Sequence, residues 1–154
     1  MKKSIILLSA LLVAIVFTAS AVDFSGNWKL NKSKSKLGEQ FSMAPSILIA
    51  AQSATDFNVE KHIAFQDQEM TTKEKYTLDG KESVNPGFQD SQKKSTAVWS
   101  GDKNSLTITS KIPMGDNDMT TVEVYKIVDG NLVIDSKMSS SFGENNETMV
   151  FEKQ

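Results

Sequence analysis

Short runs in which apolar and polar residues alternate follow one another along most of the chain, and turn residues separate them. The alternation has a period of two, which is the period of β-strands with one buried face. Asp79-Gly80 and Asp129-Gly130 stand between such runs, and Asp-Gly is typical of tight hairpin turns because both residues tolerate a positive φ. The predicted strands span 24–30, 46–51, 56–65, 71–78, 81–84, 94–100, 105–112, 119–128, 131–138 and 148–153. The pattern predicts an all-β, antiparallel up-and-down chain that needs no helix after Val22.

The first 21 residues have a different pattern. Lys2 and Lys3 precede an apolar run over 5–17, and the small residues of 18–21 follow it. A positive start, an apolar middle and an Ala-x-Ala cleavage site together predict a secretory signal peptide. The apolar run has 13 residues, fewer than the roughly 20 of a membrane-spanning helix. We therefore expect a signal peptide over 1–21, no stable membrane anchor after cleavage, and one exported domain over 22–154.

Composition narrows the possible partners. All 17 basic residues are lysines, and the chain after residue 21 keeps 15 of them against 19 acidic residues, a net charge of −4. An acidic domain without arginine is a poor binder of nucleic acid, which needs clustered positive charge. The chain has no cysteine, which excludes disulfides and lipid attachment through a cysteine.

Polar residues interrupt the apolar faces of four predicted strands. Lys61, Ser110, Lys126 and Ser136 each share an alternating face with apolar neighbours. A packed core rarely holds an unpaired lysine, so these residues predict a barrel interior that holds water or a ligand. Each lysine should then contact a carboxylate, a water molecule or a ligand anion. Two alternatives are that the lysines reach solvent from strand ends and that a β-bulge shifts the register.

The segment 24–31 contains Gly26-Asn27-Trp28, a Gly-x-Trp triplet on the first predicted strand. This triplet resembles the opening motif of lipocalins and other calycins, and the chain resembles bacterial exported lipocalin-like domains. The resemblance implies a β-barrel in which Trp28 plugs the closed end and Gly26 allows close chain approach. Typical lipocalins stack an arginine on the motif tryptophan. Here Lys153 is the nearest substitute.

Candidate catalytic and metal-binding residues are sparse. His62 is the only histidine, and its strand phase points it away from the predicted apolar face. No Gly-x-Ser-x-Gly nucleophile elbow accompanies it, so we expect no catalytic residues and no enzyme. Asp116-Asn117-Asp118 clusters oxygen ligands but lacks the rest of an EF-hand loop, so we expect a polar turn there and no metal or cofactor.

The predicted function follows from the resemblance rather than from a reactive site. It is the binding of a small apolar or amphipathic ligand outside the cytoplasm, in the periplasm or the medium. Interior lysines would favour an anionic amphiphile such as a fatty acid over its neutral alcohol. The alternative is a filled β-barrel that acts as an envelope-associated interaction module without a ligand cavity. Cavity volume distinguishes the two hypotheses, because ligand sites typically measure some hundreds of Å³.

Overall fold

The computed structural model describes residues 20–39, 42–65, 68–87, 91–115 and 117–154. Within these residues, ten β-strands form one antiparallel sheet. The strands are β1 (Gly26–Leu30), β2 (Ile47–Gln52), β3 (Asp56–Phe65), β4 (Gln68–Thr77), β5 (Glu82–Pro86), β6 (Gln92–Trp99), β7 (Ser105–Met114), β8 (Asn117–Val128), β9 (Asn131–Ser140) and β10 (Gly143–Lys153). The predicted all-β meander is confirmed. A search of the same residues finds no helix with the length and apolar character to cross a membrane.

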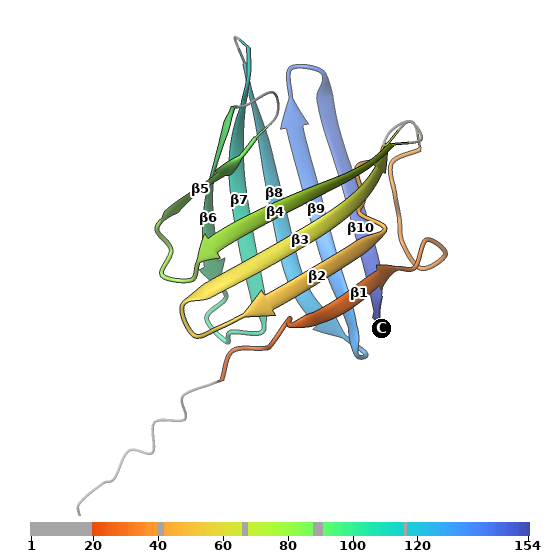
Figure 1. Cartoon of the computed structure of the whole chain (residues 1–154), viewed down its shortest axis with the longest axis vertical. Helices are drawn as coiled ribbons and strands as arrows, with labels where there is room; N and C mark the ends of the chain where they lie inside the picture. The colour runs from red at the N-terminus through yellow and green to blue at the C-terminus, as the bar shows by residue number, and fades with distance from the viewer. Residues whose placement is uncertain (1–19, 40–41, 66–67, 88–90, 116) are drawn as a thin grey trace, which may run out of the picture.

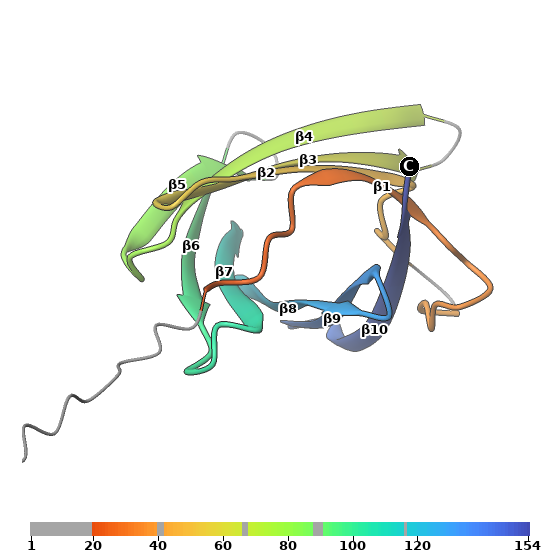
Figure 2. The ribbon, with the colours of Figure 1, turned by 90° about the horizontal axis from the view of Figure 1, so that it is seen from below.

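The sheet is a meander in which the first and last strands pair with each other. Its strand order is β4-β3-β2-β1-β10-β9-β8-β7-β6-β5. The pairing of β1 with β10 places Trp28 opposite Lys153. The sheet curls into a nearly closed barrel with two facing layers, β1–β4 in one and β7–β10 in the other (Figure 2). In Figure 1 the strands β1–β4 run obliquely across the strands of the second layer.

Side chains rather than a backbone ladder connect β4 to β5, the two ends of this strand order. Asn85 Oδ1 accepts a hydrogen bond from the backbone N–H of Lys75 at 2.7 Å, and its Nδ2 donates to the Lys75 carbonyl at 3.0 Å. Ser83 Oγ accepts from the backbone N–H of Thr77 at 3.0 Å. These side chains satisfy backbone groups that an open sheet edge would leave unpaired.

The turns and strand ends show where local sequence decides the structure. Asp129 and Gly130 both have a positive φ, 51° and 77°, as the predicted tight hairpin between β8 and β9 requires. β10 begins at Gly143 and β8 at Asn117, earlier than the predicted starts at 148 and 119. The predicted polar turn at 116–118 is therefore partly strand, because Asn117 and Asp118 lie in β8 while residue 116 lies outside the described residues.

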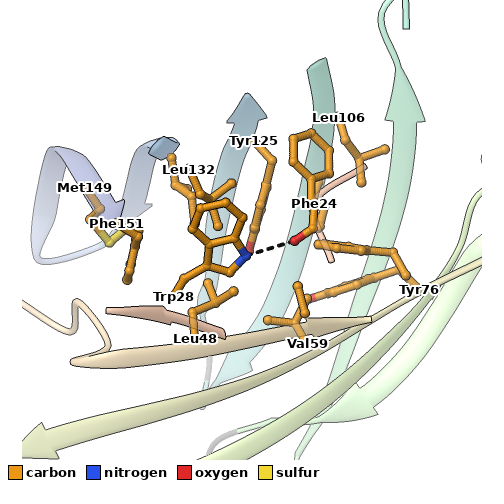
Figure 3. Packing of buried hydrophobic residues seen from close by; sticks show 14 of the residues in the cluster. Phe24, Trp28, Leu48, Val59, Tyr76, Leu106, Tyr125, Leu132, Met149 and Phe151 are labelled. Atoms are coloured by element: carbon orange, nitrogen blue, oxygen red, sulfur yellow. Dashed lines mark hydrogen bonds between the residues drawn. The ribbon is translucent and has the colours of Figure 1, made fainter. Parts of the chain in front are cut away.

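The packed part of the core surrounds Trp28 of the Gly-x-Trp triplet (Figure 3). Trp28 is 3% exposed, and its Nε1–H donates to the Phe24 carbonyl at 2.9 Å. The Lys153 ammonium lies 5.5 Å from the centre of the Trp28 ring, a cation–π distance. Gly26 has a φ of 147°, and a Cβ there would lie 3.1 Å from Lys153 Cε. The predicted burial of Trp28 is confirmed, and the sequence places a glycine where Lys153 comes close to the chain.

Aromatic rings pack against one another in this region. The Phe24 ring stacks on Trp99 with a centroid distance of 5.8 Å, and it forms a T-shaped pair with Phe57 with a centroid distance of 5.9 Å. Tyr125 meets Phe57 in a T-shaped contact at 5.5 Å. Offset and edge-on ring pairs of this kind add to the stabilisation from burial alone. The open part of the interior lies on the other side of Tyr76 and Tyr125, whose hydroxyl groups reach carboxylates that line the cavity.

Candidate functional site

A cavity of about 280 Å³ occupies the barrel interior. Its wall is built by residues from β3, β4, β6, β7, β8, β9 and β10, together with the segment before β2 and the end of β5. The wall has a charged part, contributed by Lys61, Glu74, Lys93 and Glu123, and an apolar part, contributed by methionines and Ile63. This combination of apolar surface with a few convergent polar groups is the usual character of a small-molecule site.

The charged part of the wall is a network of buried ion pairs. Lys61 Nζ lies 3.0 Å from Glu123 Oε1 and 3.6 Å from Glu74 Oε2. Lys93 pairs with the other carboxylate oxygen of Glu74, and Tyr76 OH donates to Glu74 at 2.5 Å. The four charged side chains are between 8% and 13% exposed. We call Lys61, Glu74, Lys93 and Glu123 the ionic cluster.

The ionic cluster shifts the pKa values of Glu74 and Lys61. Burial by itself would raise the pKa of Glu74, but the charges of Lys61 and Lys93 and hydrogen bonds from Lys93 and Tyr76 outweigh it and lower the pKa to about 2. Burial would lower the pKa of Lys61, and the carboxylates of Glu123 and Glu74 reverse this and raise it well above its ordinary value. Both groups therefore keep their charges at neutral pH because each has partners of opposite sign.

The two tyrosines above the aromatic core remain protonated. Burial raises the pKa of the Tyr76 and Tyr125 hydroxyls well above the ordinary value near 10. The Tyr125 hydroxyl lies 3.4 Å from Glu123 Oε2, close enough for a weak hydrogen bond. A protonated phenol donates one hydrogen bond and accepts others, so these groups add neutral polar partners to the charged wall.

Methionines form much of the apolar wall. The described residues that line the cavity include Met43, Met70, Met119, Met138 and Met149. They come from the β1–β2 connection and from strands in both layers. The sequence analysis did not assign these residues to the site. Because the thioether side chain is flexible and polarizable, a methionine wall adapts to ligands of different shape.

The residues predicted from the sequence to face the interior divide into three groups. Lys61 and Ser136 line the cavity. Ser110 is buried, but it hydrogen-bonds Ser95 at 2.8 Å and is not part of the cavity lining. Lys126 is on the outer face, where its Nζ lies 2.5 Å from Asp135 Oδ2 with the side chain 38% exposed. Whether any of them contacts a ligand stays a prediction.

The expected interior position of Lys126 is wrong because the sequence analysis chose the wrong face of β8. It took Val122, Val124 and Lys126 as inward-facing. In the structure, Glu123 joins the ionic cluster and Tyr125 packs in the core, so the even-numbered residues of this strand face outward. The valines line a shallow hollow on the outside of the barrel with Lys36 and Lys137, which gives them partial burial without an interior position.

Sequence analysis also missed Glu74, Lys93 and Glu123. Their signal was present in the alternation, since Glu74 precedes Tyr76 by two residues and Glu123 precedes Tyr125 by two. An aromatic residue at a buried position implies that the residue two places away shares its face. Because acidic side chains are usually exposed to solvent, the sequence analysis did not assign Glu74 and Glu123 to the inward face of their strands.

His62 lies where its strand phase predicted, on the face of β3 opposite Lys61 and Ile63. Its Nε2 is 2.8 Å from Glu60 Oε1 and its Nδ1 is 3.1 Å from Glu69 Oε1. These two hydrogen bonds raise the pKa of His62. A search of the described residues finds no group of three or more metal-ligating side chains suited to a metal ion.

Solved structures share this architecture, while sequence comparisons give no relative. No protein-family model matches the chain, and no curated protein matches it significantly. A zebrafish ileal bile acid-binding protein complexed with cholic acid aligns with a TM-score of 0.60 and 19% identity, over 85% of this chain and 98% of that one. A mutant of the fluorescent protein UnaG aligns with a TM-score of 0.56 and 17% identity, over 84% and 95%. Human cRBP IV aligns with a TM-score of 0.56 and 16% identity, over 86% and 99%.

These likenesses establish the class of fold. The chain is an antiparallel meander that curls into a nearly closed β-barrel, the fold of these structures. At less than 20% identity, the likenesses define the architecture and leave the ligand open.

Proposed function

We propose that this protein binds a small apolar or amphipathic molecule in its barrel and that it does so without catalysis. The observation that carries the proposal is the cavity of about 280 Å³, which combines an ionic cluster with an apolar methionine wall. Its volume is near the lower end of the range for small-molecule sites, roughly 300–1,000 Å³. The zebrafish bile acid-binding protein, whose structure is a complex with cholic acid, supports a binding role for this class of barrel.

The proposal includes export. The basic, apolar and small-residue segments of 1–21 support a signal peptide, and the domain would then begin at Val22. N-terminal sequencing of the protein from the exported fraction of its own cells tests this part. A first residue of Val22 in that fraction is the expected result. A chain that still begins at Met1 and is recovered only with membranes contradicts it.

A titration with Nile red, an uncharged apolar dye, tests the cavity. Thr121 lines the cavity from β8, and Thr120 precedes it on the opposite face of the strand. We expect Thr121→Trp to fill the cavity and weaken dye binding by about tenfold or more. Thr120→Trp adds the same ring to the outside and should leave the affinity within about twofold.

Two results would contradict ligand binding in the barrel. One is the absence of saturable dye binding by the unmodified protein. The other is an equal effect of Thr120→Trp and Thr121→Trp, because the dye would then bind outside the cavity. Either result favours the alternative of a barrel that acts as an interaction module.

A further inference from the structure

The charged residues that line the cavity carry a small excess of negative charge. Among the described residues that line it, Lys61 and Lys93 face Glu74, Glu123 and Glu147. Both lysines are engaged by carboxylates of the ionic cluster. Glu147 accepts a hydrogen bond from the backbone N–H of Gly38 at 2.8 Å. The wall therefore offers an incoming anion no unpaired cation among these residues.

We infer that the cavity selects amphiphiles with an uncharged polar head group, such as a hydroxyl, over those with a carboxylate. This inference rests on the proposed binding function and specifies the ligand class of the same cavity. This inference is the opposite of the preference for a fatty acid that the sequence predicts. That prediction assumed that the interior lysines are free to pair with a ligand anion. The structure gives Lys61 and Lys93 protein carboxylates as partners instead.

A ligand carboxylate has no favourable position beside this cluster. To pair with Lys61 it must displace Glu123 or Glu74, which leaves a buried protein carboxylate without its cation. An unpaired buried charge is strongly unfavourable. If it displaces neither group, it brings a further negative charge close to Glu147, Glu74 and Glu123 in a region of low dielectric. Both arrangements also require the carboxylate to lose its hydration shell.

A hydroxyl group fits the same surroundings at lower cost. It donates one hydrogen bond and accepts others, and the cluster supplies both kinds of partner. Carboxylate oxygens of Glu74 and Glu123 accept, whereas the ammonium groups of Lys61 and Lys93 donate. The ion pairs remain intact during binding, so no buried charge is left without a partner. The methionine wall then contacts the apolar chain of the ligand.

Competition experiments with decanol and decanoate test the inference. Each competitor displaces Nile red from the protein at pH 7.5, and the measured quantity is the ratio of the two competitors' dissociation constants. We expect decanol to bind about tenfold more tightly than decanoate. An alcohol is also more apolar than a carboxylate and could bind more tightly for that reason alone. The test of the inference is therefore how the ratio of the two dissociation constants changes in variants of the wall.

Three glutamate-to-glutamine variants isolate the charge of the wall. Glu123→Gln leaves one lysine charge in excess in the ionic cluster and should shift the ratio towards decanoate by about tenfold. Glu147→Gln removes a lining carboxylate outside the cluster and should shift it in the same direction by about threefold. Glu144→Gln is the matched control, since Glu144 lies on β10 with Glu147 but is exposed and paired with Lys137. It should leave the ratio unchanged.

The outcomes separate this inference from the proposed function. If Nile red binds and both competitors displace it, but Glu123→Gln and Glu147→Gln leave the ratio as in Glu144→Gln, the head-group inference is overturned and ligand binding stands. If decanoate binds the unmodified protein more tightly than decanol, the inference is also overturned. If Nile red does not bind, the proposed function itself fails. Should Glu123→Gln not fold, Glu147→Gln decides alone, because its hydrogen bond with Gly38 can persist with an amide oxygen.

Discussion

Replacing Glu74 by glutamine should destabilise the fold by about 3 kcal/mol or more. Glu74 contacts both lysines of the ionic cluster and accepts a hydrogen bond from Tyr76. In Glu74→Gln, Lys61 keeps Glu123 as a partner, whereas Lys93 loses the ion pair that the structure gives it. The Lys93 side chain is only 9% exposed, and removing one partner of a buried ion pair typically costs about 3–5 kcal/mol.

The proton equilibrium of Glu74 gives a second measure of the same interaction. Its pKa falls from 4.5 to about 2 in the folded protein, which corresponds to roughly 3 kcal/mol at neutral pH. Because the folded pKa is below the unfolded one, this stabilisation is present above about pH 4.5 and is lost as the pH falls towards about 2. The unmodified protein should therefore lose stability over this range, and Glu74→Gln should lose much less.

Urea denaturation at pH 7 and at pH 3 measures both effects. Lys93→Met combined with Glu74→Gln should recover most of the loss at pH 7, because the uncompensated cation is then absent. Glu144→Gln is an exposed control and should change the free energy of unfolding by less than about 0.5 kcal/mol. A loss below about 1 kcal/mol for Glu74→Gln, or equal acid sensitivity in the variant and the unmodified protein, would refute the stabilising role of the buried Glu74–Lys93 pair.

The remaining predictions concern the core, the β4–β5 junction and the outer face. Trp28→Ala should cost about 3–5 kcal/mol in a denaturant titration, and a loss near that of a surface substitution would contradict its core position. Asn85→Ala should increase hydrogen exchange at the Lys75 amide, because this amide donates its hydrogen bond to the Asn85 side chain. The Thr77 amide donates to Ser83 and should stay protected. Equal exchange at both amides in the variant would argue against separate side-chain links. His62→Ala should leave the melting temperature and Nile red affinity nearly unchanged, and a large loss of affinity would link the outer face to the cavity.

The fold could be predicted from the sequence because alternation and turn chemistry agree over most of the chain. Asp129-Gly130 fixes a hairpin by its backbone preference alone. On β3 the apolar residues alternate so regularly that Lys61 is placed correctly inside and His62 outside. The starts of β8 and β10 were placed too late because polar residues dominate there, and pairing with neighbouring strands maintains the ladder without an apolar pattern.

The candidate site was only partly predictable, because the burial of its charged residues depends on ion pairs between strands that are distant in the sequence. Lys61 is recognisable because it interrupts an apolar face, but Glu74 stands in a strand of mostly polar residues. Its burial depends on Lys61 and Lys93, which lie 13 residues before it and 19 after it in the sequence. Ion pairing across strands makes an interior position acceptable for a carboxylate, and a single sequence does not reveal which charges meet. Lys126 shows the opposite case. The alternation placed it inside, but it lies on the outer surface in a pair with Asp135, and a single sequence does not reveal that pair.

The pairing of β1 with β10 has a consequence for the order in which the barrel can form. Trp28 lies on β1 and contributes to the aromatic core, yet the neighbour of β1 on one side is the last strand of the chain. The N-terminal part of the chain is synthesised first and can form the hairpins β2–β3 and β3–β4 early, since those contacts are local. The two halves of the sheet join only after Phe151 and Lys153 have emerged. Such non-local closure slows folding, so the unfinished barrel leaves its core residues exposed to aggregation until synthesis has reached β10.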